Sequence, residues 1–147
     1  MNTFFSDAKI PMLEKDLEAL IGKKCDQEET LITLPIEALA KFDVTDMTLN
    51  DAACRAEKNQ THWILKTKST SCDSVISFNA NNPIMRNEIH LKFSPQSELY
   101  GYLVRVRFTC KYAPGIFGLY PVTDDISDDG LEYDRYVHNL FGGTNSH

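Results

Sequence analysis

The sequence lacks the features of membrane-spanning, nucleic-acid-binding and nucleotide-binding proteins. No apolar run approaches the roughly 18 residues that a bilayer-spanning helix needs. The 147 residues include 15 lysines and arginines against 21 aspartates and glutamates, a formal net charge of −6. That balance disfavours a nucleic-acid partner and a polybasic membrane patch. P-loop and G-x-G-x-x-G motifs are also missing. The length fits one globular domain with flanking segments.

The arrangements of residues that support catalysis are missing as well. No serine or cysteine lies in a G-x-S-x-G setting. The four histidines, His62, His90, His138 and His147, are scattered over two strand-like segments, a candidate helix and the terminus. Paired carboxylates occur only in an acidic stretch, where nothing would desolvate them and raise a pKa. We therefore expect no enzyme, no catalytic residues and no cofactor.

Metal-ligand spacing is missing too. There is no C-x-x-C pair, and the histidines are not spaced as zinc ligands relative to the cysteines. The acidic stretch, D-D-I-S-D-D-G-L-E, lacks the order of an EF-hand calcium loop. Like-charge runs of this kind are typical of solvated linkers. Its acids are Asp124, Asp125, Asp128, Asp129, Glu132 and Asp134.

Four cysteines are present, Cys25, Cys54, Cys72 and Cys110. They allow three disulfide pairings, among which the sequence alone cannot choose. The alternative is four reduced, buried cysteines in a cytosolic protein. The start, MNTFFSDAK, has neither the basic region nor the apolar core of a signal peptide, which read literally indicates the cytosol. The cysteine pattern instead favours an oxidising, extracellular compartment, and we prefer that interpretation.

Period-two alternation is the strongest structural signal. From Tyr102 to Tyr112, aromatic, valine and cysteine residues alternate with mostly charged or polar ones, which predicts a strand with one buried face. Shorter strand-like runs occupy residues 31–34, 47–50, 62–67, 75–78 and 88–93. Several short strands with turns between them predict an all-β, immunoglobulin-like antiparallel sandwich. Trp63, the only tryptophan, is expected to anchor its core.

The flanks of this β-rich region are predicted to differ from it. Residues 1–22 form a lead segment with a short amphipathic helix that begins near Pro11 and stops at Gly22. A helical turn is expected at 36–42. Ala113-Pro114-Gly115 is expected to end the last strand, and residues 114–147 form an acidic interdomain linker or tail. A second short helix is expected at 131–141.

The order of the cysteines and several short motifs resembles the N-terminal half of the zona pellucida (ZP) module, the ZP-N domain. The resemblance covers residues 23–113, the predicted β-sandwich. One departure is Cys72-Asp73-Ser74, where many family members have C-G-T. The matching elements are Cys25 before a strand ending in L-P, L-N-D-A-A-C at 49–54, T-H-W-I-L at 61–65, M-R-N-E-I at 85–89 and F-T-C-K-Y at 108–112.

The resemblance implies disulfides Cys25–Cys110 and Cys54–Cys72. It implies a non-catalytic extracellular module for protein–protein interaction and polymerisation in a filament- or coat-forming glycoprotein, with other ZP modules as partners. The alternative is the ectodomain of a membrane co-receptor for growth factors of the transforming growth factor β superfamily. Because the second half of the module is absent, we expect a fragment of a longer, membrane-anchored precursor.

Two surface features are candidates for modification and contact. Asn59-Gln60-Thr61 fits the N-glycosylation pattern and lies in a polar connection between two strands. The outward face of the Tyr102–Tyr112 strand is basic, with Arg105, Arg107 and Lys111, and the acidic segment could fold back on it or meet it on a neighbouring chain. Tyr112 is expected in the core, with an exposed contact as the alternative. Antiparallel sandwiches also have edge strands that can pair with another chain.

Overall fold

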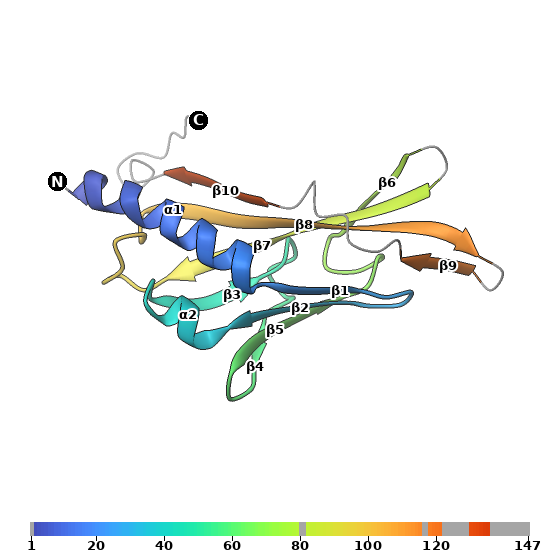
Figure 1. Cartoon of the computed structure of the whole chain (residues 1–147), viewed down its shortest axis with the longest axis horizontal. Coiled ribbons are helices and arrows are strands. Elements are labelled where there is room, and N and C mark those ends of the chain that lie inside the picture. Colours follow the sequence, from blue (N-terminus) through green and yellow to red (C-terminus); the bar gives the residue numbers. More distant parts are fainter. Residues whose placement is uncertain (1, 80–81, 116–117, 122–129, 136–147) are drawn as a thin grey trace.

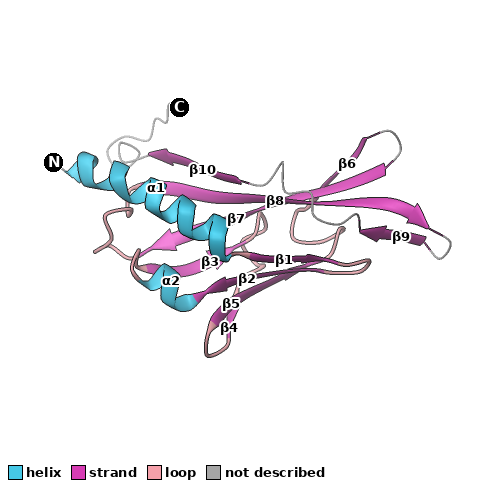
Figure 2. Cartoon of the chain, in the orientation of Figure 1, coloured by secondary structure: helices cyan, strands magenta, loops and turns pink. Residues whose placement is uncertain are grey.

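In the computed structural model, the described residues are 2–79, 82–115, 118–121 and 130–135. Their strands form two antiparallel sheets, accompanied by two helices, α1 and α2 (Figures 1 and 2). The sheets pack against each other and enclose a common apolar core. This arrangement confirms the predicted all-β sandwich.

The smaller sheet has the strand order β1-β2-β5-β4. The strands β2 and β5 pair along their whole length, from Thr30 opposite Thr67 to Pro35 opposite His62. The two-residue strand β4 lies in the polar connection before Asn59, which the sequence presents only as a loop. The bounds are β1 Gly22–Cys25, β2 Thr30–Pro35, β4 Glu57–Lys58 and β5 His62–Thr67.

The larger sheet has the order β10-β8-β7-β3, with β6 also paired to β7 and β9 also paired to β8. Its centre is the β7–β8 hairpin, in register from Ile84 opposite Lys111 to Leu91 opposite Val104. The bounds are β3 Val44–Thr48, β6 Val75–Asn79, β7 Asn82–Phe93, β8 Tyr102–Gly115, β9 Gly118–Pro121 and β10 Gly130–Arg135. In β8, Tyr102, Val104, Val106, Phe108, Cys110 and Tyr112 are all buried, as the alternation predicts.

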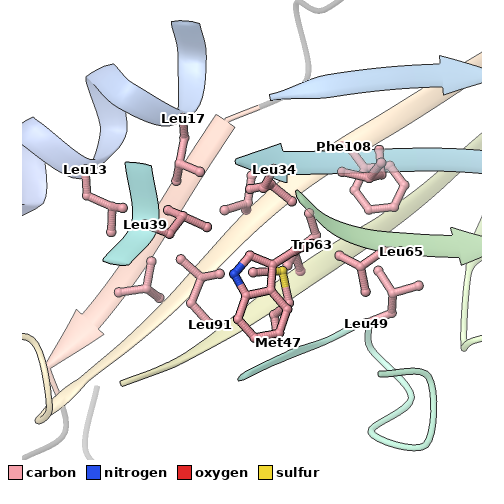
Figure 3. Packing of buried hydrophobic residues seen from close by; sticks show 14 of the residues in the cluster. Leu13, Leu17, Leu34, Leu39, Met47, Leu49, Trp63, Leu65, Leu91 and Phe108 are labelled. Carbon is pink, nitrogen blue, oxygen red and sulfur yellow. The ribbon is translucent and has the colours of Figure 1, made fainter. Parts of the chain in front are cut away.

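The core lies between the sheets and holds large apolar side chains from both of them (Figure 3). Trp63 of β5 is buried, which confirms its role as an anchor, and the Lys58 ammonium lies 4.4 Å from the centroid of its ring. Side chains from β3 and β7, such as Met47 and Leu91, face those of β2 and β5 in this core. Because apolar burial is the main favourable term in folding, this cluster is what holds the sheets together.

Helix α1 (Asn2–Leu20) covers one end of the sandwich, and α2 (Ile36–Ala40) follows β2 as the expected helical turn. Ile10, Leu13 and Leu17 of α1 are buried at helical spacing. The expected start near Pro11 is wrong, because the helix begins at Asn2 and Pro11 lies inside it. Proline removes one backbone hydrogen bond there, and the burial on either side stabilises the helix nonetheless.

Two expectations about the C-terminal flank are also wrong. Ala113-Pro114-Gly115 does not end the strand, because β8 runs to Gly115 and pairs with β9. Residues 131–135, expected as the start of a helix, belong to β10, which pairs with β8 from Tyr102 to Arg107. The rest of the acidic stretch, 122–129, and residues 136–147 lie outside the described part of the chain.

Candidate interaction surface

The long-range disulfide joins the two sheets. Cys25 ends β1 and Cys110 lies in β8, with 5.8 Å between their Cα atoms. Cys110 is buried, and its sulfur lies 3.3 Å from the hydroxyl oxygen of Thr30. The bridge links residues 85 positions apart, so it removes much conformational entropy from the unfolded chain. This pair is one of the two that the family resemblance implies.

The short disulfide, Cys54–Cys72, joins the connections that follow β3 and β5. Beside it, the Asp51 N–H donates to the Cys72 carbonyl at 3.3 Å. Cys72 and Asp73 have φ angles of 58° and 56°, in the left-handed region that favours glycine. The departure from C-G-T therefore places an aspartate where glycine would fit with less backbone strain.

The buried amide of Asn87 in β7 ties this disulfide region to the larger sheet, and sequence reasoning missed it. Asn87 is only 1% exposed. Its Oδ1 accepts from the backbone N–H of Asn50 at 3.0 Å and of Glu88 at 2.7 Å. Its Nδ2 donates to the Cys72 carbonyl and to the Ser74 hydroxyl, both at 2.9 Å. Because all these bonds are made, the amide can be buried without an unsatisfied polar group.

Asn59 lies in the tight turn between β4 and β5. Its Oδ1 accepts hydrogen bonds from the backbone N–H of Thr61 at 2.8 Å and of His62 at 2.7 Å. This side-chain turn is a typical use of asparagine between strands. The residue is exposed.

The basic residues of β8 lie within the sheet, not at its edge. Arg105 and Arg107 are half-buried on the outer face. The register places Glu132 of β10 opposite Arg105, and Glu88 of β7 opposite Arg107. The end of the acidic segment thus folds back on β8 as a paired strand, one of the two arrangements considered from the sequence. Lys111, also half-buried, lies opposite Ile84 in β7.

His90 shares this outer face, and its environment disfavours protonation. Its Nε2 lies 3.1 Å from Oδ1 of Asn50. Partial burial lowers the pKa of His90 below its ordinary value, against the opposing effect of Glu88 and with smaller contributions from Arg105 and Lys92. His90 is half-buried, although its charged neighbours in the sequence, Glu88 and Lys92, are typical of a solvated strand face.

Tyr112 belongs to the core. It is 5% exposed, and its hydroxyl donates to the Asp26 carbonyl at 3.1 Å, in the turn between β1 and β2. The core assignment favoured from the alternation of β8 is therefore the one that the structure shows. With Tyr112 buried and β8 paired on both sides, a contact surface has to be found on other strands.

Most outer strands in the described part of the chain carry devices that discourage pairing with another chain. Charges, prolines, bulges and shortness all have this effect. The strand β1 contains two lysines, and β9 ends in Pro121. The strand β4 consists of only two residues, and both are charged. In β3 the register shifts between Val44 and Asp46, and β10 carries Glu132, Asp134 and Arg135.

The strand β6, V-I-S-F-N, has none of these devices. Among the described strands it pairs with β7 alone, from Val75 opposite Arg86 to Asn79 opposite Asn82. Its apolar side chains are largely exposed, Val75 at 55%, Ile76 at 41% and Phe78 at 69%. Figure 1 shows this hairpin at the end of the sandwich opposite to α1. A strand edge with such side chains is a place where another chain can add a strand.

Nothing in the described part of the chain indicates a metal or membrane site. No group of three or more histidine, cysteine, aspartate or glutamate side chains in it is placed to hold a metal ion. Neither of its helices has the length and apolarity needed to cross a bilayer.

The fold and site together define a disulfide-linked β-sandwich with an exposed apolar strand edge. The family model of the ZP-N domain matches residues 25–113, so the chain belongs to the ZP-N domain family. ZP-N domains are structural, non-catalytic modules of extracellular proteins that work through protein–protein assembly. A comparison with curated proteins found no match.

Proposed function

We propose that this chain is an extracellular module that joins protein chains into a filament or coat, with other ZP modules as its partners. The observation that carries the proposal is the unprotected edge of β6, where Val75, Ile76 and Phe78 are exposed and no residue is charged. Large exposed apolar side chains on a free strand edge favour aggregation unless they have a partner. In an assembly, the neighbouring protein chain is that partner.

The test uses the full-length secreted protein after its natural processing. Sedimentation and electron microscopy should show polymers of the unchanged protein and mainly monomers of a Phe78→Lys variant. The matched control is Tyr100→Lys, because Tyr100 is 50% exposed but lies outside the strands. This control should assemble as the unchanged protein does.

The rival function, capture of a growth factor of the transforming growth factor β superfamily, makes the opposite prediction. A co-receptor would stay monomeric after processing and would bind the growth factor tightly through this domain. That result, with no polymer at any protein concentration tested, would rule out the proposed assembly function.

A further inference from the structure

The register of β6 on β7 sorts its side chains onto two faces. Ile76 lies opposite Met85, which is fully buried in the core, so Ile76 is on the inner face of the sheet. Phe78, two residues further along, is on the same face. Val75 and Ser77 are on the outer face, where the Ser77 hydroxyl accepts a hydrogen bond from Nη1 of Arg86 at 3.1 Å.

We propose that β6 pairs antiparallel with β6 of a second copy of this chain, around a two-fold axis that passes through Ser77. The inference rests on the proposed function and adds its partner and its register. The larger sheet of one copy and the larger sheet of the other would then form one continuous sheet across the axis. Such a contact is isologous, with the same surface used on both copies.

Two conditions select this register: the symmetry of identical antiparallel strands, and the number of residues of β6 that are paired. The two-fold axis must be perpendicular to the sheet, so the inner face of one copy continues into the inner face of the other. Opposed residues must therefore share a face. With Ser77 opposite itself, all five residues of β6 pair, and Ile76 lies opposite Phe78 of the second copy. Cross-strand apolar pairs of this kind stabilise sheets, and this one occurs twice.

Charge explains why two copies should pair through β6 and not through another outer strand. An isologous contact opposes each strand with itself, so strands with like charges repel each other. Self-pairing of β1 would bring either Lys23 or Lys24, depending on the register, directly opposite the same lysine of the second copy. The strand β6 has no charged residue, so nothing in the strand opposes its self-pairing.

The contact is small, so it should be weak in isolation. One added strand pair and two exposed aromatic side chains bury less than the roughly 1,000 Å² of a stable specific interface. In a polymer, other contacts would raise the effective concentration of the two edges and strengthen it. The dimer of the isolated chain is therefore expected only at high protein concentration.

The first test is cysteine cross-linking under mild oxidation, at high concentration of the chain and in the assembled full-length protein. Ser77→Cys should give a disulfide-linked dimer, because directly opposed Cα atoms lie about 4.5–5.5 Å apart, within disulfide range. The control is Val75→Cys on the same face of β6. Val75 is well exposed, but in this register residue 75 of one copy and residue 75 of the other would be about 13 Å apart along the strands. Equal cross-linking of both variants would show random collision and would overturn the register.

The second test is a charge exchange, read by sedimentation equilibrium of the chain. Ile76→Lys and Phe78→Glu should each weaken self-association about tenfold, and the double variant should regain most of it. Recovery follows only if these two positions face each other across copies. If Phe78→Lys abolishes polymers of the full-length protein but neither test reports self-pairing, the partner of β6 is another segment. The inference would then fail while the proposed function stands.

Discussion

Replacing Asn87 by alanine should destabilise the domain severely without touching either disulfide. The side chain is buried in β7 and makes four hydrogen bonds. Three of them reach the connections that carry the short disulfide, at Asn50, Cys72 and Ser74. The substitution would remove these bonds and would leave the backbone N–H of Asn50 without the acceptor shown for it.

The magnitude follows from the bonds that are lost. A typical intramolecular hydrogen bond contributes about 0.5–1.5 kcal/mol net, and a buried group left unsatisfied costs about 1–3 kcal/mol. The Cys72 carbonyl keeps the Asp51 N–H as a donor, so its loss is partial. The Asn50 N–H loses the acceptor shown for it. Together these give a loss of about 3 kcal/mol in the free energy of unfolding, a large share of the 5–15 kcal/mol typical of a domain.

Urea denaturation with the disulfides intact measures this loss, because the transition midpoint shifts while the slope stays constant. The control is Asn82→Ala, an exposed asparagine in the same strand, which should change the free energy by less than about 0.5 kcal/mol. If Asn87→Ala shifts the midpoint no more than this control does, the amide does not hold the disulfide region to the sheet.

Three further predictions concern the disulfides, His90 and Asn59. Replacing both cysteines of the long bridge by alanine should cost about 4–5 kcal/mol, and those of the short bridge about 3 kcal/mol, measured by urea denaturation; equal costs would contradict the dependence on loop length. Because the pKa of His90 is lowered in the folded state, the unfolded state binds the proton more tightly, so stability should fall as the pH drops below about 6.5. The slope should be smaller in His90→Gln; an unchanged slope would exclude His90 as its source. Protein secreted from eukaryotic cells should carry a glycan on Asn59, seen as a gel shift after glycosidase treatment that Thr61→Ala abolishes, and an unshifted band would refute the modification.

The strand framework could be predicted because its signals are local and repeated. The alternation of Tyr102–Tyr112 reports one buried face, and the structure shows the same face buried. The error at Pro114 has a physical reason. Proline lacks the backbone N–H donor and is tolerated at the edge of a sheet, and the pairing of β8 with β7 ends at Lys111, so Pro114 is paired with β9 alone in the described part of the chain. Residues 131–135 are too few to separate a helix from a strand by periodicity. Pairing with β8 decides between them.

The candidate site could be predicted less well, because it depends on what lies beside each strand. Asn87 falls on the buried face that Met85 and Ile89 define, so a satisfied amide could have been inferred, but not its partners in distant connections. The uncharged run Val75–Phe78 was visible as a strand. That it forms an unprotected edge, while β8 is paired on both sides, follows only from the order of the strands.

The most direct test of the central claim, that β6 is the assembly edge, is amide hydrogen exchange of the full-length protein before and after assembly. The backbone amides of Val75–Asn79 that point away from β7 should become protected on assembly, because strand addition gives them new hydrogen-bond partners. Amides of the charged outer strand β4 should exchange as before. Protection at β4 or another outer strand with none at β6 would contradict the claim.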